Sequence, residues 1–262
     1  MPELPEVETF RRTFEQKALD KNIREVEVVA PEILRDIEAD QFCETVESET
    51  FTRTKRWGKF LFCQLSNKNR WMVVHFGMSG YFRYIDSKED RHKHDRALVF
   101  LRKAPIVAFN CMRKFGFLGI VKNPEKYMKE KGFGPDIKEI SSDEFVEALE
   151  ERSRSLKSAL LEQGIFAGLG NLYADESLFQ ARLNPKQKVS TLSSEQLLRL
   201  FETIQKVLDE AIKNKADYGR FPSEFFIHHR ESDGHCPSCG SNLKREKVAG
   251  RTTFYCPSCQ EF

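Results

Sequence analysis

The chain has 262 residues, of which 40% are hydrophobic, and a formal net charge of +2. This length accommodates one large or two modest domains with real cores, and so small a net charge does not by itself indicate a polyanionic partner. The first residues, MPELPEVETF, carry acids instead of an apolar signal core, and no uncharged apolar run reaches the roughly 18 residues that a membrane span needs. We therefore predict a protein of the cytoplasm and nucleoid, without a targeting signal or a membrane span.

A short amphipathic helix is the first predicted element. Val7, Phe10 and Phe14 recur at helical spacing within residues 5–18, after a turn that contains Pro2. From about residue 23 the pattern changes to short β-branched and aromatic runs between polar turns, such as WMVVHF and PIVAFN. These runs predict that an antiparallel β-sandwich with one flanking helix fills residues 1–123.

Proline and glycine breaks among many charges mark residues 124–140 as a linker. Helical patterns dominate residues 141–225, where Ser141 with Glu144 and Ser193 with Gln196 are candidate capping boxes. Two predicted helices between about 157 and 182 flank the glycine-rich turn GIFAGLGN. The fold class is therefore α+β and multidomain.

Four of the seven cysteines are clustered near the C-terminus. The motif CPSC occurs at 236–239 and again at 256–259, with sixteen residues between the two copies. This spacing is typical of a tetrahedral zinc site formed by Cys236, Cys239, Cys256 and Cys259. The intervening residues supply two strands around Gly250, so residues 226–262 are predicted to form a β-hairpin zinc finger. Disulfides are the alternative, which a reducing compartment disfavours. Four thiolates fill the zinc shell, so one structural Zn²⁺ is expected and catalysis must lie elsewhere.

Several short motifs occur together and in a fixed order along nearly the whole chain. They are MPELPEVET at the start, GK in RWGK, HFGMSG, RKFG, GLGNLYADESLFQARLNP and VAGRTTFYCPSC. In this combination the chain resembles the family of formamidopyrimidine-DNA glycosylase and endonuclease VIII, and it is closer to the formamidopyrimidine branch. The resemblance implies a helix-two-turn-helix domain before the zinc finger. It also implies a base-excision-repair enzyme with glycosylase and AP lyase activities.

The resemblance implies a catalytic set. With Met1 removed, the amine of Pro2 attacks C1′ of the damaged nucleotide and forms an iminium, after which elimination cleaves the strand. Glu3 donates a proton to the sugar ring oxygen, and Glu6 helps to hold the site. Lys59, which we place on a strand after Gly58, serves as acid catalyst or charge stabiliser. On the residues alone, Pro2 could be only a turn former, and the acids could be only favourable charges in a first helical turn.

A duplex-binding enzyme of this kind must flip the damaged nucleotide and fill the gap. The resemblance assigns the wedge to Met78, Arg113 and Phe115. Core packing is the alternative for Met78 and Phe115, although their glycine-flanked loops favour the wedge. The remaining DNA contacts implied are phosphate contacts by His75, by Asn171 with the amides of the GLGN turn, and by Arg251. Asn171 could equally be a helix N-cap.

The chain departs from the family pattern at three places. Trp57 stands in RWGK where small residues are common, and Cys111 with Met112 precedes RKFG where aspartate and proline are typical. Residues 213–230 are shorter than the lesion-capping loop of the branch that excises 8-oxoguanine. We therefore expect ring-opened purines or oxidised pyrimidines to be better substrates than 8-oxoguanine.

The predicted partner is double-stranded DNA with a damaged base, bound by a monomer without a nucleotide cofactor or a membrane. A catalytically silent damaged-DNA-binding protein of the same fold is the alternative, because fold alone does not establish catalysis. Pro2, Glu3 and Lys59 together argue against it. A zinc-ribbon regulator or RNA-binding module would explain only the cysteines.

Overall fold

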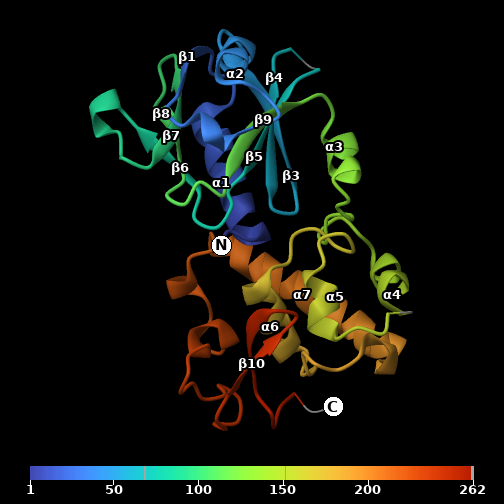
Figure 1. The fold of residues 1–262 in the computed structure, drawn as a ribbon. Helices are drawn as coiled ribbons and strands as arrows, with labels where there is room; N and C mark the ends of the chain where they lie inside the picture. Colours follow the sequence, from blue (N-terminus) through green and yellow to red (C-terminus); the bar gives the residue numbers. More distant parts are fainter. Residues whose placement is uncertain (68, 151, 261–262) are drawn as a thin grey trace. The chain divides into compact units, whose positions relative to one another are not determined.

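The computed structural model describes residues 1–67, 69–150 and 152–260 (Figure 1). The chain divides into two compact units: an N-terminal unit of Met1–Pro2 with Glu6–Gly132, and a C-terminal unit of Glu3–Pro5 with Phe133–Phe262. Glu261 and Phe262, the last residues of the predicted zinc-finger segment, lie outside the described part. The domain bounds given above remain predictions.

Two β-sheets build the N-terminal unit (Figure 1). The four-stranded sheet has the order β1-β7-β8-β6, and the five-stranded sheet has the order β2-β9-β5-β4-β3. The strands are β1 (Ile23–Val28), β2 (Leu34–Arg35), β3 (Phe51–Trp57), β4 (Phe60–Leu65), β5 (Trp71–His75), β6 (Tyr81–Ile85), β7 (Asp95–Leu101), β8 (Ile106–Asn110) and β9 (Phe117–Val121). The predicted antiparallel arrangement is confirmed except at β2, whose two residues pair in parallel with β9.

The core of this unit is the apolar layer that both sheets share with helix α1 (Leu4–Ala18). Val7 and Phe14 of the helix are fully buried, as the helical spacing predicted. Phe14 contacts Phe51 of β3 and Phe82 of β6, with ring centroids 5.0 Å and 5.4 Å away. The helix therefore packs against strands of both sheets. Two further helices, α2 (Ala39–Val46) and α3 (Pro124–Glu130), belong to the same unit, and α3 occupies the start of the predicted linker.

Helices dominate the C-terminal unit up to about residue 230. They are α4 (Ser142–Glu150), α5 (Leu156–Leu161), α6 (Asn171–Gln180) and α7 (Ser194–Lys213), with short 3₁₀ turns at Val189–Thr191, Tyr218–Arg220 and Phe226–His229. Both predicted capping boxes are confirmed. In each, the serine hydroxyl accepts a bond from the amide three residues on, and the side-chain oxygen of Glu144 or Gln196 accepts a bond from the backbone amide of the serine. Every residue of helix α7 is described by the structure. Of its large apolar side chains, that of Leu198 is exposed, at 37%.

The zinc-finger hairpin consists of β10 (Lys244–Val248) and β11 (Arg251–Tyr255). Its turn residues, Ala249 and Gly250, both have positive φ, at 51° and 71°. This geometry is that of the two-residue turn whose twist suits a β-hairpin. Among the described residues, no helix is both long and apolar enough to cross a membrane.

Candidate active site and metal centre

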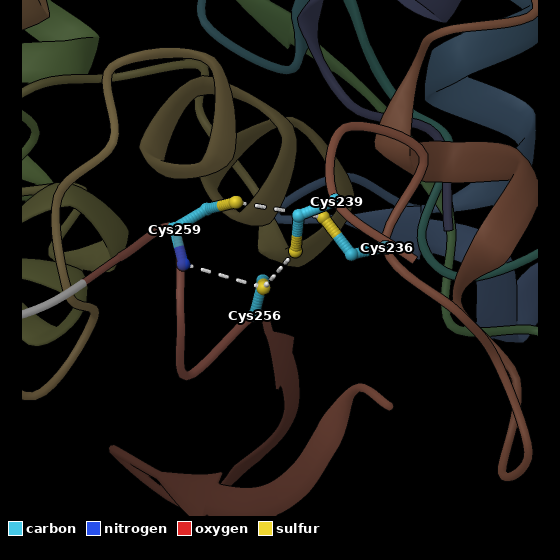
Figure 2. Close-up of side chains that lie close together, drawn as sticks. All are labelled: Cys236, Cys239, Cys256 and Cys259. Atoms are coloured by element: carbon cyan, nitrogen blue, oxygen red, sulfur yellow. Dashed lines mark hydrogen bonds between the residues drawn. The ribbon is translucent and has the colours of Figure 1, made fainter. Parts of the chain in front are cut away.

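The four clustered cysteines converge on one point (Figure 2). Their sulfur atoms all lie within 4.8 Å of one another, with 3.8 Å between Cys236 and Cys259 and 3.6 Å between Cys239 and Cys256. A tetrahedron of thiolates at about 2.3 Å from a zinc ion has edges of about 3.8 Å. The arrangement therefore fits one structural Zn²⁺, and the cysteines are not joined in disulfides.

Packing ties the zinc finger to helix α6. Phe179 of α6 stacks on Phe226 with ring centroids 4.5 Å apart, and both rings belong to the apolar cluster that includes Cys236 and Cys256. On the hairpin side, Asn171 Nδ2 donates to the carbonyl of Thr252 over 2.9 Å. The metal thus holds in place a hairpin that lies directly against α6 (Figure 1).

The N-terminus of α6 binds the carboxylate of Glu3. The amides of Leu172 and Tyr173 donate to its two oxygens over 3.0 Å and 3.3 Å, and the residue is 4% exposed. Free amides and the helix dipole at this end of a helix favour an anion. The sequence predicted an anion here but expected a DNA phosphate, whereas two of the amides hold the protein's own acid.

Gly170 makes this contact possible. It is the N-cap of α6, and a Cβ built on it would lie 2.2 Å from Cδ of Glu3 and 2.4 Å from Oε1. Any side chain at this position would occupy the place of the Glu3 carboxylate. The N-cap is therefore Gly170, and Asn171 is the first helical residue, which corrects the alternative that Asn171 is the cap.

A buried ion cluster lies behind the same helix. Lys157 of α5 is fully buried, with Nζ 2.5 Å from Asp175 Oδ1 and 2.7 Å from Thr253 Oγ1. Arg230 Nη2 lies 2.6 Å from the other oxygen of Asp175. Burial lowers the pKa of Lys157, whereas the charges of Asp175 and Glu3 oppose that shift. The cluster joins α5, α6, the segment before the zinc finger and β11.

Lys59 and His75 lie at one end of the five-stranded sheet. Lys59 is in the two-residue turn between β3 and β4, after Gly58 with φ 55°, and not on a strand as predicted. His75 packs between Phe60 and Phe117 and accepts a bond from the Gly77 amide at Nδ1. Burial, and then the charges of Lys59 and Arg35, lower the pKa of His75 to about 4. Its imidazole is therefore neutral near pH 7, with the proton on Nε2.

The predicted wedge residues come from two loops whose backbones touch. Met78 follows β5, while Arg113 and Phe115 follow β8. A Cβ added at Gly77 would lie 2.4 Å from the Gly116 nitrogen, so only a glycine at position 77 permits this approach. Met78 is 41% exposed and Phe115 is 62% exposed, so neither belongs to the core.

The remaining predicted residues lie at or near the start of the chain, except Arg251, which is exposed at the start of β11. Met1 is 54% exposed, and Pro2 and Glu6 are half-buried. Two residues after Glu6, the carboxylate of Glu8 is fixed by Arg11, Arg12 and Arg56.

The structure thus groups the predicted residues within each unit. Lys59 lies near His75, the loop of Met78 touches that of Phe115, and Glu3 is beside Asn171, which contacts the strand of Arg251. Sequence reasoning treated Gly170 only as one glycine of the GIFAGLGN turn, and it did not single out Lys157 or Asp175. A lysine inside the apolar stretch SLKSALL was the available signal for Lys157.

Comparison with known families covers most of the chain. Residues 1–118 match the formamidopyrimidine-DNA glycosylase N-terminal domain, and residues 132–222 match the H2TH domain of the same enzyme. Residues 235–261 match a zinc finger found in FPG and IleRS. The three matches occur in the order that the motifs indicated.

Relatives that match over their full length belong to the same family as the domain matches. The formamidopyrimidine-DNA glycosylase of Pelotomaculum thermopropionicum is 35% identical to this chain, and the match covers 100% of this chain and 99% of the relative. That of Carboxydothermus hydrogenoformans is also 35% identical, and the match covers 100% of both chains. The structure of the Lactococcus lactis enzyme bound non-covalently to DNA with an AP site superposes with a TM-score of 0.90 and 28% identity over 100% of both chains. Another structure similar to this chain is a mutant of that enzyme in complex with DNA containing Fapy-dG, with a TM-score of 0.88 and 28% identity over 100% of both chains. This chain therefore belongs to the formamidopyrimidine-DNA glycosylase family of bifunctional DNA glycosylases and AP lyases.

Proposed function

We propose that this chain, as a monomer, excises damaged bases from double-stranded DNA in the cytoplasm through the amine of Pro2, without a nucleotide cofactor. The observation that carries the proposal is the anchoring of Glu3 by the amides of Leu172 and Tyr173. Because Glu3 follows Pro2 directly, anchoring the Glu3 side chain also restrains the residue that bears the amine, whose Cα lies about 3.8 Å from that of Glu3. A nucleophile and a carboxyl group are thereby held next to each other.

The amine and the carboxyl group have complementary tasks. The secondary amine attacks C1′, and the base leaves with the electrons of its bond to C1′ and takes up a proton from solvent. The sugar ring then opens as its oxygen takes a proton from the Glu3 carboxyl group. The nitrogen lone pair then forms an iminium with C1′, which acidifies the C2′ proton and allows elimination of the 3′ phosphate. Glu3 reaches its protonated form by accepting a proton within the complex, for example from the attacking amine.

Lys59 and Glu6 support this chemistry in the proposal. Lys59 extends from a tight turn whose partner strands are fixed in register, Trp57 opposite Phe60. An ammonium group on so rigid a turn can stabilise charge that develops on the lesion or its phosphate. Glu6, in the first turn of α1, helps to hold the amine in position.

Met78, Arg113 and Phe115 fill the gap that the flipped nucleotide leaves. Two exposed apolar side chains on touching loops, with an exposed cation between them in the sequence, suit unstacked bases and a phosphate backbone. His75, Asn171 and Arg251 contact phosphates. His75 does so as a neutral donor through Nε2, since its Nδ1 is already occupied.

The lesion class that we propose rests on residues 213–230. Phe221, Phe225 and Phe226 of this segment are buried, and the carboxylate of Glu176 accepts bonds from the amides of Phe226 and Ile227 over 3.1 Å and 2.8 Å. A short segment packed in this way leaves little chain to fold over a base. We propose that ring-opened purines or oxidised pyrimidines are excised faster than 8-oxoguanine, and single-turnover rates on the three lesions test this order.

The test of the amine mechanism is borohydride trapping. The chain is incubated with duplex DNA that carries an abasic site, reduced, and digested for peptide mass spectrometry. We expect the cross-link at Pro2, and we expect its loss in protein that retains Met1, whose residue 2 has no free amine. DNA binding without a trapped adduct would refute the mechanism and favour the silent binding protein.

A further inference from the structure

The N-terminal unit leaves an apolar patch in solvent. Within the part of this unit that the structure describes, the exposed large apolar side chains other than Met1 are Met78, Tyr81, Met112 and Phe115, at 41%, 41%, 53% and 62%. All four belong to, or directly follow, the loops after β5 and β8. Soluble monomers rarely gather exposed apolar side chains in this way unless the patch binds something. The wedge accounts for Met78 and Phe115, but it leaves Tyr81 and Met112 unexplained.

The register of the sheet makes Tyr81 and Met112 neighbours of the wedge. Tyr81, the first residue of β6, pairs with Asn110, the last residue of β8. Met112 comes two residues after Asn110, at the start of the loop that ends in Phe115 and Gly116. Since Gly77 abuts the backbone of Phe115 and Gly116, the four side chains belong to one surface.

Hydrogen bonds fix the backbone of Met112, so the exposure of its side chain does not come from a loose loop. The guanidinium of Arg96 donates to the carbonyls of Cys111 and Met112 over 3.0 Å and 3.3 Å. Cys111 is fully buried, and its Sγ accepts the Gly116 amide over 3.4 Å. This thiol closes the turn from which Met112 and Phe115 project. A side chain presented by a fixed backbone loses little freedom when it binds.

We propose that Met112 and Tyr81 pack on the base left without a partner opposite the lesion and on the base pair beside it. The inference rests on the proposed wedge, in which Met78, Arg113 and Phe115 already fill the space of a single flipped nucleotide. Side chains at the border of that wedge are then placed to meet the bases around the gap. A thioether and a phenol ring both pack well on the flat faces of bases. Larger bases offer more face, so this contact makes binding depend on the opposite base.

The test is equilibrium binding to uncleavable duplexes that carry tetrahydrofuran, an abasic-site analogue, opposite each of the four bases. We expect Met112→Ala and Tyr81→Ala to weaken binding by about five- to tenfold opposite purines, the effect of withdrawing part of one apolar contact. We expect a smaller loss opposite pyrimidines. Leu198→Ala, which truncates an exposed apolar side chain of the C-terminal unit, is the matched control and should bind like the wild type. Zinc content and thermal melting verify that each variant is folded.

The outcomes separate this inference from the amine mechanism. Wild-type affinity in both variants, or an equal loss opposite all four bases, would overturn it. Borohydride trapping of the same variants reports independently on Pro2. If no adduct forms but the dependence on the opposite base changes, the amine mechanism fails while the contact stands.

Discussion

Gly170, which the sequence indicated only as one glycine of a turn, allows a sharp test of the proposed site. In Gly170→Ala the added methyl would lie 2.2 Å from Cδ of Glu3, more than about 1 Å inside an ordinary contact. The backbone of Gly170 has negative φ and tolerates alanine, so the glutamate is the group that must move. It would then lose the bonds of 3.0 Å and 3.3 Å to the α6 amides.

The expected size of the effect on the excision rate follows from the role proposed for Glu3. A positioned general acid accelerates a reaction by roughly 100- to 10,000-fold, and a displacement of about 1 Å can cost roughly 100-fold. We therefore expect single-turnover excision of a formamidopyrimidine lesion to slow about 100-fold in Gly170→Ala. Glu3→Gln should slow it at least as much. Affinity for duplex DNA with tetrahydrofuran should change little, because the side chains proposed to contact phosphates are unaltered.

The control is a variant that is destabilised by a substitution far from Glu3. Ser193→Ala removes the capping box of α7 and costs about 1 kcal/mol of unfolding free energy without touching Glu3. It should excise at the wild-type rate. If Gly170→Ala also excised at that rate while folded, the amide-held carboxylate would have no part in catalysis, and the argument for the amine site would lose its main support.

Three further predictions concern the metal, the buried ions and the titration of His75. One zinc per chain should be found by atomic absorption, and Cys256→Ser should lose it together with DNA affinity, since the hairpin depends on four thiolates; zinc-free protein with intact binding would contradict this. Asp175→Asn leaves Lys157 and Arg230 without their anion, so urea denaturation should show a loss of about 3 kcal/mol, and a loss below about 1 kcal/mol would show that the ions are solvated. His75 has a pKa of about 4 when folded and about 6.5 when unfolded, so between these values the unfolded chain binds more protons. Stability should therefore fall by up to about 3 kcal/mol as pH drops from 6.5 to 4, and the fall should be smaller in His75→Gln; equal falls in both proteins would refute the shift.

The sequence predicted the parts of this molecule whose causes are local. Cysteine spacing predicted the zinc centre because two tight turns and one hairpin bring all four thiols together. Short β-branched and aromatic runs between polar turns predicted the strands of the sandwich, because such side chains favour the extended conformation. Serine with glutamate or glutamine three residues later predicted two helix starts, and the structure has both.

Contacts between distant segments were beyond that kind of reasoning. Glu3 meets an amide 169 residues along the chain, and Lys157 reaches Thr253 across 96 residues. Nothing in the local pattern distinguishes Glu3 from a solvated acid, and the apolar neighbours of Lys157 do not indicate which residue it contacts. Lys59 was misplaced for a different reason: Gly58 adopts φ 55° and closes a two-residue turn, whereas periodicity alone continued the strand.

The anchoring of Glu3 also explains why a protein would fix a catalytic amine through its neighbour. An N-terminal residue has no preceding chain and therefore frays unless something ties it down. Binding the amine directly would occupy the group that must attack. Holding the next carboxylate on backbone amides restrains the amine through a single peptide unit and leaves its lone pair available. In the mechanism proposed for this chain, two adjacent residues meet these two requirements: Pro2 supplies the free nucleophile, and Glu3 keeps it ordered.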